Sequence, residues 1–289
     1  MNEDPNKAIL LQINRLRNLP ALPEVNMRIL NAINDPDIEI DKLADVLSMS
    51  PSLVARLLGL ANSSYFGQAR QVNDLPTAIF QVLGLDLVKS LSLGIVLNVQ
   101  FDTGKCQAFN SNYFWTRSLL AAICAQKLAH ANRLKSFSLS TVYASGLLLY
   151  IGMLVLGFLI PEEMNAIFLE SKKNQICVGD TIKQNLGNSH YHFGFLLLQK
   201  WQLSPVYLAV LNHFEDPDFS GEERPLINLL TLCHTISSSL MDHKSVDMVE
   251  LESLRVKLSL SNSGLEALIE ELIENRENIQ KLASIMGNG

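Results

Sequence analysis

Apolar residues recur at spacings of three and four along almost the whole chain, whereas runs with a period of two are short and rare. This periodicity is typical of amphipathic α-helices. Proline and glycine divide the pattern into segments that are each short enough for one helix. Helices are predicted to begin near Pro23, Ile40, Pro51, Leu75, Leu85, Tyr113, Leu139, Pro161, Gly179, Ser189, Pro205 and Arg224. We therefore predict an all-α fold.

Two local signals mark particular helix starts. Ser50 precedes Pro51, so the serine is expected to cap the free amides while the proline takes the first turn, where no N–H is needed. The sequence from Ser263 to Glu266 (SGLE) fits a capping box, in which the two side chains each accept from the other's backbone amide. The last helix is therefore predicted to start at Ser263.

One segment is apolar enough to be considered as a membrane span. Residues 136–161 carry no charge, and residues 146–160 are almost wholly apolar. A span needs about 20 apolar residues. This segment, however, is interrupted by glycines, follows a serine-rich flank and lacks a bracketing Lys/Arg cluster. We favour a helix from about Leu139 to Ile160 that is buried on all sides in a globular core, so no membrane contact is expected.

The C-terminal segment has an apolar stripe that allows two interpretations. Its members are Leu265, Leu268, Leu272, Asn275, Ile279, Leu282 and Met286. Spacings of three and four suit a dimerising coiled coil. Because Ile269 and Ile273 widen the stripe and the run is short, docking on the protein's own core is favoured. A homodimer through the C-terminal helix stays open as the alternative.

Composition narrows the function classes. The chain has 289 residues, of which 48% are hydrophobic, so it can bury a large core. Its net charge of −6 argues against binding to a phosphate backbone, and no nucleic-acid partner is expected. Two short segments, 40–48 and 51–62, have a helix-turn-helix-like rhythm, but Arg56 is the only basic side chain of the second.

The cysteines and the N-terminal residues indicate the cellular compartment in which the protein is expected. Cys106, Cys124, Cys177 and Cys233 form no CxxC pair, and we expect reduced core thiols in a cytosolic protein. The first residues have neither a basic nor an apolar region of the kind that a secretory signal needs. A cytoplasmic location is therefore expected.

Three motifs resemble those of the HDOD family. They are Leu19 to Glu24 (LPALPE), Leu57 to Gly67 (LLGLANSSYFG) and Ser189 to Trp201. HDOD proteins are bacterial signalling domains related to the HD phosphohydrolases and are regarded as lacking enzymatic activity. The resemblance covers residues 11–217. It implies an N-terminal helical bundle, about 11–104, packed on a deviant HD-type helical core, about 105–217. Residues 218–289 would then form a C-terminal helical extension that packs on the core.

The resemblance also implies what has happened to the metal site. An active HD enzyme holds one or two divalent metals with clustered His and Asp ligands. Here Arg117 stands at the position of the first His, and Leu149 and Tyr150 stand at the His-Asp pair. A guanidinium is always protonated and cannot ligate a metal. We expect no metal and no other cofactor, and we expect Arg117 to pair with a carboxylate at the core edge rather than to accept an anion.

Some ligand types remain. His190, His213 and His234 lie at or near family positions, and together they could hold one metal. The alternative is three separate histidines, and His190 and His192 do not share a helix face. We favour the second interpretation.

A second set of residues forms a candidate partner or ligand surface: Glu24, Arg56, Asn62, Ser63, Tyr65 and Gly67. The simpler interpretation is a structural turn, because Asn and Gly tolerate left-handed backbone angles. Tyr65 and Phe66 would then pack against the bundle.

These observations predict a non-catalytic bacterial signal-transduction module that acts by binding a protein or a small ligand. Its partners would be other signalling proteins, such as a receiver domain or a cyclic-dinucleotide enzyme on a separate chain. The alternative is a metal-dependent phosphohydrolase or phosphodiesterase that uses a residual site of His190, His213 and His234.

Overall fold

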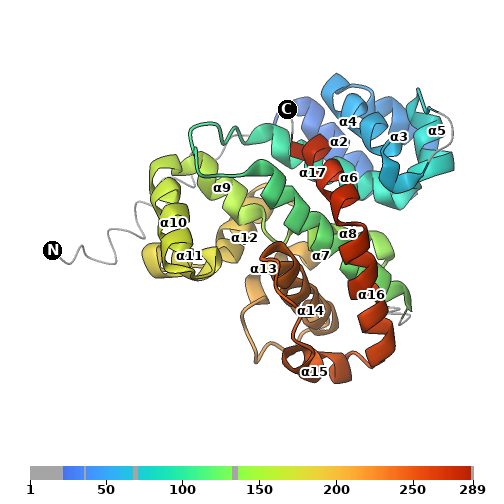
Figure 1. The fold of residues 1–289 in the computed structure, drawn as a ribbon. Helices are drawn as coiled ribbons and strands as arrows, with labels where there is room; N and C mark the ends of the chain where they lie inside the picture. Colours follow the sequence, from blue (N-terminus) through green and yellow to red (C-terminus); the bar gives the residue numbers. More distant parts are fainter. Residues whose placement is uncertain (1–21, 36, 68–70, 132–135, 288–289) are drawn as a thin grey trace.

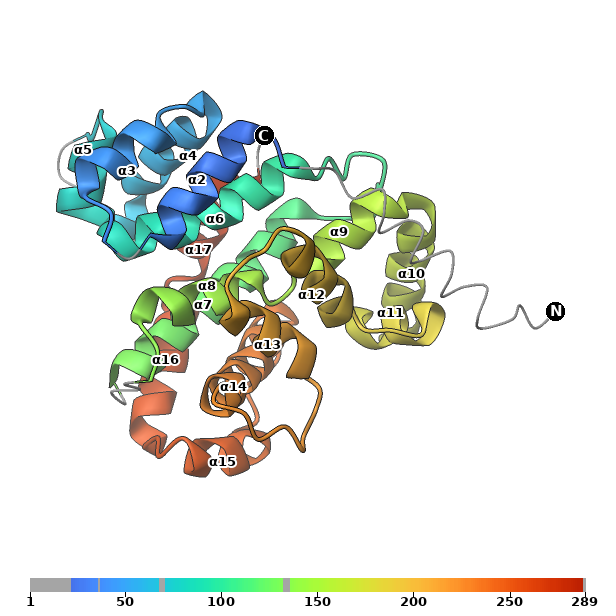
Figure 2. The same ribbon diagram turned by 180° about the vertical axis from the view of Figure 1, so that it is seen from behind.

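A computed structural model describes residues 22–35, 37–67, 71–131 and 136–287, and within these ranges every regular element is a helix (Figures 1 and 2). The all-α prediction is confirmed. Residues 11–18 of the HDOD-like region and Leu19 to Ala21 of its opening motif lie outside the described residues.

The first part of the chain forms a small bundle. Its elements are α2 (Glu24–Asn34), α3 (Ile40–Leu47), α4 (Pro51–Ala61), the 3-10 turn η1 (Ser64–Phe66), α5 (Leu75–Thr77), the π-helical η2 (Ala78–Leu83) and α6 (Leu85–Gln100). Pro51 occupies the first turn of α4 as predicted, but the capping role of Ser50 is wrong, because its side chain caps no backbone amide. The Ser50 hydroxyl instead lies 3.4 Å from the hydroxyl of Ser52.

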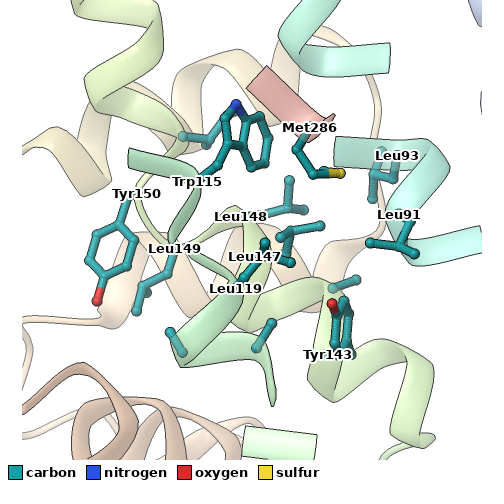
Figure 3. Close-up of a cluster of buried hydrophobic side chains, with 14 of the residues drawn as sticks. Leu91, Leu93, Trp115, Leu119, Tyr143, Leu147, Leu148, Leu149, Tyr150 and Met286 are labelled. Carbon is teal, nitrogen blue, oxygen red and sulfur yellow. The ribbon is translucent and has the colours of Figure 1, made fainter. Parts of the chain in front are cut away.

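The second part of the chain begins with α7 (Ser111–Ala131), which is buried along most of its length, and continues with the remaining helices. They are α8 (Leu139–Leu148), α9 (Ile151–Leu159), α10 (Pro161–Asn174), α11 (Val178–Leu186), α12 (His190–Lys200), α13 (Pro205–His213), α14 (Arg224–Met241), α15 (Met248–Lys257), α16 (Asn262–Glu274) and α17 (Arg276–Gly287). Helix α7 packs against α8, α14 and α17. Figure 3 shows how Leu91 of α6, Trp115 of α7, Leu147 of α8 and Met286 of α17 meet in one apolar cluster.

The apolar segment predicted as one helix is divided into α8 and α9, so that prediction is corrected. Between them lie Leu149 and Tyr150, and Tyr150 leaves helical geometry with φ −103° and ψ 7°. Residues 139–159 still pass a length and composition test for a membrane span, as does the bent pair Leu75–Leu83 and Leu85–Val99. In the first case, 89% of the most apolar window is buried inside the protein, in agreement with a core helix.

The C-terminal stripe docks on the protein's own core, as favoured from the sequence, and it is split at Asn275 into α16 and α17. The cap is not the predicted one: Ser261, not Ser263, precedes α16 and accepts from the Gly264 amide at 3.1 Å. Helix α17 packs against α7 and also against α4 and α6. In both ribbon views the C-terminal end therefore lies beside the N-terminal bundle (Figures 1 and 2).

The placement of Arg56 on a partner surface is wrong. Arg56 is only 7% exposed, and its guanidinium donates to the carbonyl of Met286 at 2.8 Å. The Asn98 amide donates to the same carbonyl at 3.1 Å. A cation at the C-terminus of a helix is stabilising, because the last carbonyls there have no partner within the helix. Arg56 thus joins the N-terminal bundle to α17.

An Arg56→Leu variant is expected to lose about 2 kcal/mol of free energy of unfolding, because hydrogen bonds from charged donors contribute about 1.5–3 kcal/mol. Urea denaturation of the full chain measures this loss. The control is Arg28→Leu, which removes only an exposed ion pair with Glu24 and should change stability by less than about 0.5 kcal/mol. Equal effects of the two variants would show that Arg56 does not join the two parts.

Candidate functional site

Three helices bring three of the positions predicted for a degenerate metal site around one cavity of about 180 Å³. Arg117 of α7, His190 of α12 and His234 of α14 line it, and Tyr150 at the α8–α9 break contacts all three of them. The remaining wall residues are Met153, Cys177, Gly179, Asp180, Tyr191, Phe214 and Glu215. The structure thus brings Arg117, Tyr150, His190 and His234 together, and their origin as a degenerate metal site stays a prediction.

Arg117 is a buried cation with neutral neighbours. It is 5% exposed, donates to the Ser238 hydroxyl at 2.8 Å, and places its guanidinium 4.3 Å from the centre of the Tyr150 ring. The expected carboxylate partner is a wrong prediction: in the part of the chain that the structure describes, Arg117 makes no ion pair. A desolvated cation–π contact contributes about 2 kcal/mol, whereas burying an unpaired charge costs several kcal/mol. The cation–π contact therefore offsets only part of the free-energy cost of burying Arg117.

Leu149 and Tyr150 stand where the family resemblance implies a His-Asp pair, and neither side chain supplies a carboxylate oxygen. The Tyr150 hydroxyl lies 3.1 Å from Nδ1 of His234 and 3.2 Å from the Ser237 hydroxyl. Burial raises the pKa of Tyr150 above its ordinary value, so the phenol stays neutral. Leu149 is fully buried, and Figure 3 shows it at the edge of the apolar cluster while the hydroxyl of Tyr150 points away from that cluster.

The two cavity histidines are held in their neutral forms. Burial, together with the Arg117 charge and the neighbouring His234, keeps the pKa of His190 well below its ordinary value. Burial and the Arg117 charge lower the pKa of His234 to about 3. His234 Nδ1 is also 3.3 Å from the Tyr191 hydroxyl. Neither ring nitrogen of His190 has a hydrogen-bond partner among the described residues.

His213 lies apart from this site. Its ring stacks on Phe219 with centroids 4.0 Å apart, and its Nδ1 is 3.3 Å from a carboxylate oxygen of Asp216. It does not line the cavity. Within the described ranges, no three His, Cys, Asp or Glu side chains are placed to hold a metal. The donor set of two histidines beside a fixed guanidinium does not fit the metal centre that the HD relationship implies.

Sequence reasoning missed several residues of the site. Ser237 and Ser238 of α14 bond to Tyr150 and Arg117. Together with His234 they stand at positions i, i+3 and i+4, so a polar face on an otherwise apolar helix was the signal that could have found them. The prediction of buried cysteines holds for Cys106, Cys124 and Cys233, but Cys177 is exposed at the cavity wall.

The Asn62–Gly67 turn is structural in its main contacts. The Asn62 amide donates to the Val72 carbonyl and accepts from the Val72 amide, both at 2.7 Å. Gly67 has a φ of 61°, in the left-handed region that glycine adopts without strain. The rings of Tyr65 and Phe66 meet edge to face, 5.1 Å apart, and pack on the core. Glu24 is exposed and Ser63 lies at the start of η1, and a partner at this surface stays a prediction.

Similarity to solved structures agrees with this architecture. An HDOD domain protein of unknown function from Geobacter sulfurreducens has a TM-score of 0.73 at 22% identity, with 96% of this chain and 99% of that chain covered. A Marinobacter aquaeolei VT8 protein provisionally assigned to signal transduction has a TM-score of 0.80 at 20% identity, covering 99% of this chain and 67% of that chain. A Shewanella amazonensis SB2B protein provisionally assigned as a phosphohydrolase has a TM-score of 0.75 at 22% identity, covering 95% and 97%. At these identities the likeness shows the fold.

Sequence similarity shows the family. An uncharacterised protein of Treponema pallidum (strain Nichols) is 29% identical over 229 residues, which are 76% of this chain. The chain spans 42% of the length of that relative. Residues 19–217 match the HDOD domain family, and this match includes all three motifs and the cavity residues Arg117, Tyr150 and His190. The chain therefore belongs to the HDOD domain family.

Proposed function

We propose that this chain is a non-catalytic, cytoplasmic module of bacterial signal transduction that acts by binding rather than by hydrolysis. One observation carries the proposal: the Arg117 guanidinium lies 4.3 Å from the centre of the Tyr150 ring, where the HD relationship puts metal ligands. A fixed positive charge repels a divalent cation, and neither Leu149 nor Tyr150 offers a carboxylate to offset that repulsion. The provisional assignment of the Marinobacter protein to signal transduction supports the same class of function.

The partner in this proposal is another signalling protein on a separate chain, for example a receiver domain or a cyclic-dinucleotide enzyme. Support comes from the HDOD family, whose members often stand next to such domains. The provisional assignment of a Shewanella protein of similar fold as a phosphohydrolase favours the competing function, metal-dependent hydrolysis by the residual histidines.

A hydrolase assay separates these two functions. The full chain is incubated with Mn²⁺, Mg²⁺ or Zn²⁺ and with the generic substrates bis-p-nitrophenyl phosphate and p-nitrophenyl phosphate. We expect no more turnover than in a heat-inactivated sample, and no change in a His190→Ala or His213→Ala variant. Metal-dependent turnover that either variant abolishes would replace this proposal with the hydrolase.

A further inference from the structure

We propose that the cavity around Arg117 binds a small oxyanion, of the carboxylate or phosphate class, through the Arg117 guanidinium. The inference rests on the proposed function, since an anion at Arg117 takes the place that the metals of a working hydrolase would need. It goes further by naming the chemistry of the ligand.

Arg117 brings a buried positive charge to the cavity without an acidic partner among the described residues. Arg117 is 5% exposed and lines the cavity, and its described neighbours are the Ser238 hydroxyl and the Tyr150 ring, both uncharged. The interaction of a charge with an opposite charge is much stronger in a low-dielectric interior than in water. An oxyanion that binds in the cavity would therefore be attracted more strongly by the buried Arg117 than by an exposed arginine.

The cavity also has buried hydrogen-bonding groups that are unused among the described residues. Arg117 Nε and both ring nitrogens of His190 are buried and have no partner among the residues that the structure describes. Buried polar atoms are nearly always bonded, and an unsatisfied group in a native protein asks for an explanation. The guanidinium donates from several N–H groups in a plane that matches a carboxylate or phosphate. The neutral His190 ring supplies one further N–H donor.

The wall of the cavity favours a small anion over a large one. The first turns of α11 and α12 contribute Gly179 and His190 to the cavity, and helix N-termini favour negative charge. The exposed carboxylates of Asp180 and Glu215 also line it, and Glu215 pairs with Lys183 at 3.3 Å. These two carboxylates repel large polyanions. With about 180 Å³ of volume, the cavity suits a ligand of a few heavy atoms.

Thermal unfolding tests the proposal with sodium phosphate and sodium acetate as probes, each compared with sodium chloride at the same ionic strength. We expect at least one probe to raise Tm by about 3 °C at ten times its Kd. Comparison of the shifts with phosphate and with acetate then shows whether the cavity recognises a phosphate or a carboxylate. The shift should vanish in Arg117→Met. It should persist in Arg224→Met, which removes another arginine that lies over an aromatic ring, Phe219, but does not line the cavity.

A second variant keeps the test decisive if Arg117→Met does not fold. A β-carbon at Gly179 would lie 3.2 Å from the His190 ring, so Gly179→Leu narrows the cavity and leaves Arg117 in place. Its Tm should not respond to either probe. In the wild-type protein the probe should also slow alkylation of the exposed Cys177 at the cavity wall. Shifts that are equal in wild type and Gly179→Leu, or no shift with either probe, would overturn the anion site, while the absence of hydrolysis would still support the non-catalytic function.

Discussion

A Gly152→Ala variant is expected to lose at least about 4 kcal/mol of free energy of unfolding, an exceptional value for one methyl group. Gly152 lies where α9 crosses α12. A β-carbon there would overlap the carbonyl oxygen of His190 and lie 2.8 Å from the amide nitrogen of Gly194. Both obstacles are backbone atoms, so no side-chain rotation relieves them, and the two helices must separate. Urea denaturation followed by circular dichroism measures the loss.

Gly157→Ala is the matched control, because it adds the same methyl group to the same helix. Its β-carbon would meet Thr103 and Phe109 at 3.4 and 3.6 Å, which is ordinary packing distance. Since alanine is favoured over glycine in a helix by about 1 kcal/mol, this variant should be as stable as the wild type or more so. A Gly152→Ala protein within about 1 kcal/mol of the wild type would show that α9 and α12 are not packed as closely as described.

The second large effect is a loss of stability in mild acid. His234 has a pKa of about 3 in the folded protein against an ordinary value of 6.5, and the pKa of His190 is also well below that value. Because each pKa is lower in the folded protein than in the unfolded chain, the unfolded chain takes up the proton at a higher pH when the pH falls. Their contribution is therefore fully present above pH 6.5 and, for His234, is lost as the pH falls toward 3. Between pH 7.5 and 5.0, His234 alone should lower the free energy of unfolding by about 2 kcal/mol, and His190 should lower it further.

Denaturation with urea at the two pH values tests this effect. In His234→Gln the difference in stability between pH 7.5 and pH 5.0 should shrink by about 2 kcal/mol, even though the variant is less stable at both. His130→Gln controls for the removal of an imidazole from an exposed position. If His234→Gln and wild type lost the same stability on acidification, the buried histidine would not be the source.

The fold class and most helix positions followed from the sequence, because a spacing of three and four reports burial of one helix face directly. Helix α14, for example, begins at Arg224, the residue predicted for its start. The errors came where tertiary contacts override local signals. The break at Tyr150 looks helical from its apolar neighbours, but the phenol turns toward His234 and Ser237 on α14.

The candidate site was predictable only in part. Resemblance to the family placed Arg117, Tyr150 and His190 together, since fold relatives share the positions of their helices. It could not show that Arg117 lacks a carboxylate partner or that His213 turns to Phe219, because those facts depend on side-chain contacts between helices distant in sequence. The helix α17 contact with Arg56 was hidden for the same reason, since the two residues are 230 positions apart.

We propose that the Arg117 guanidinium occupies the place of the metal centre that the HD relationship implies. Anomalous diffraction from crystals of the full chain grown with Mn²⁺ tests it most directly. We expect no manganese peak in the cavity and an arginine side chain over the Tyr150 ring. A strong manganese peak coordinated by His190 and His234, with Arg117 displaced, would contradict it.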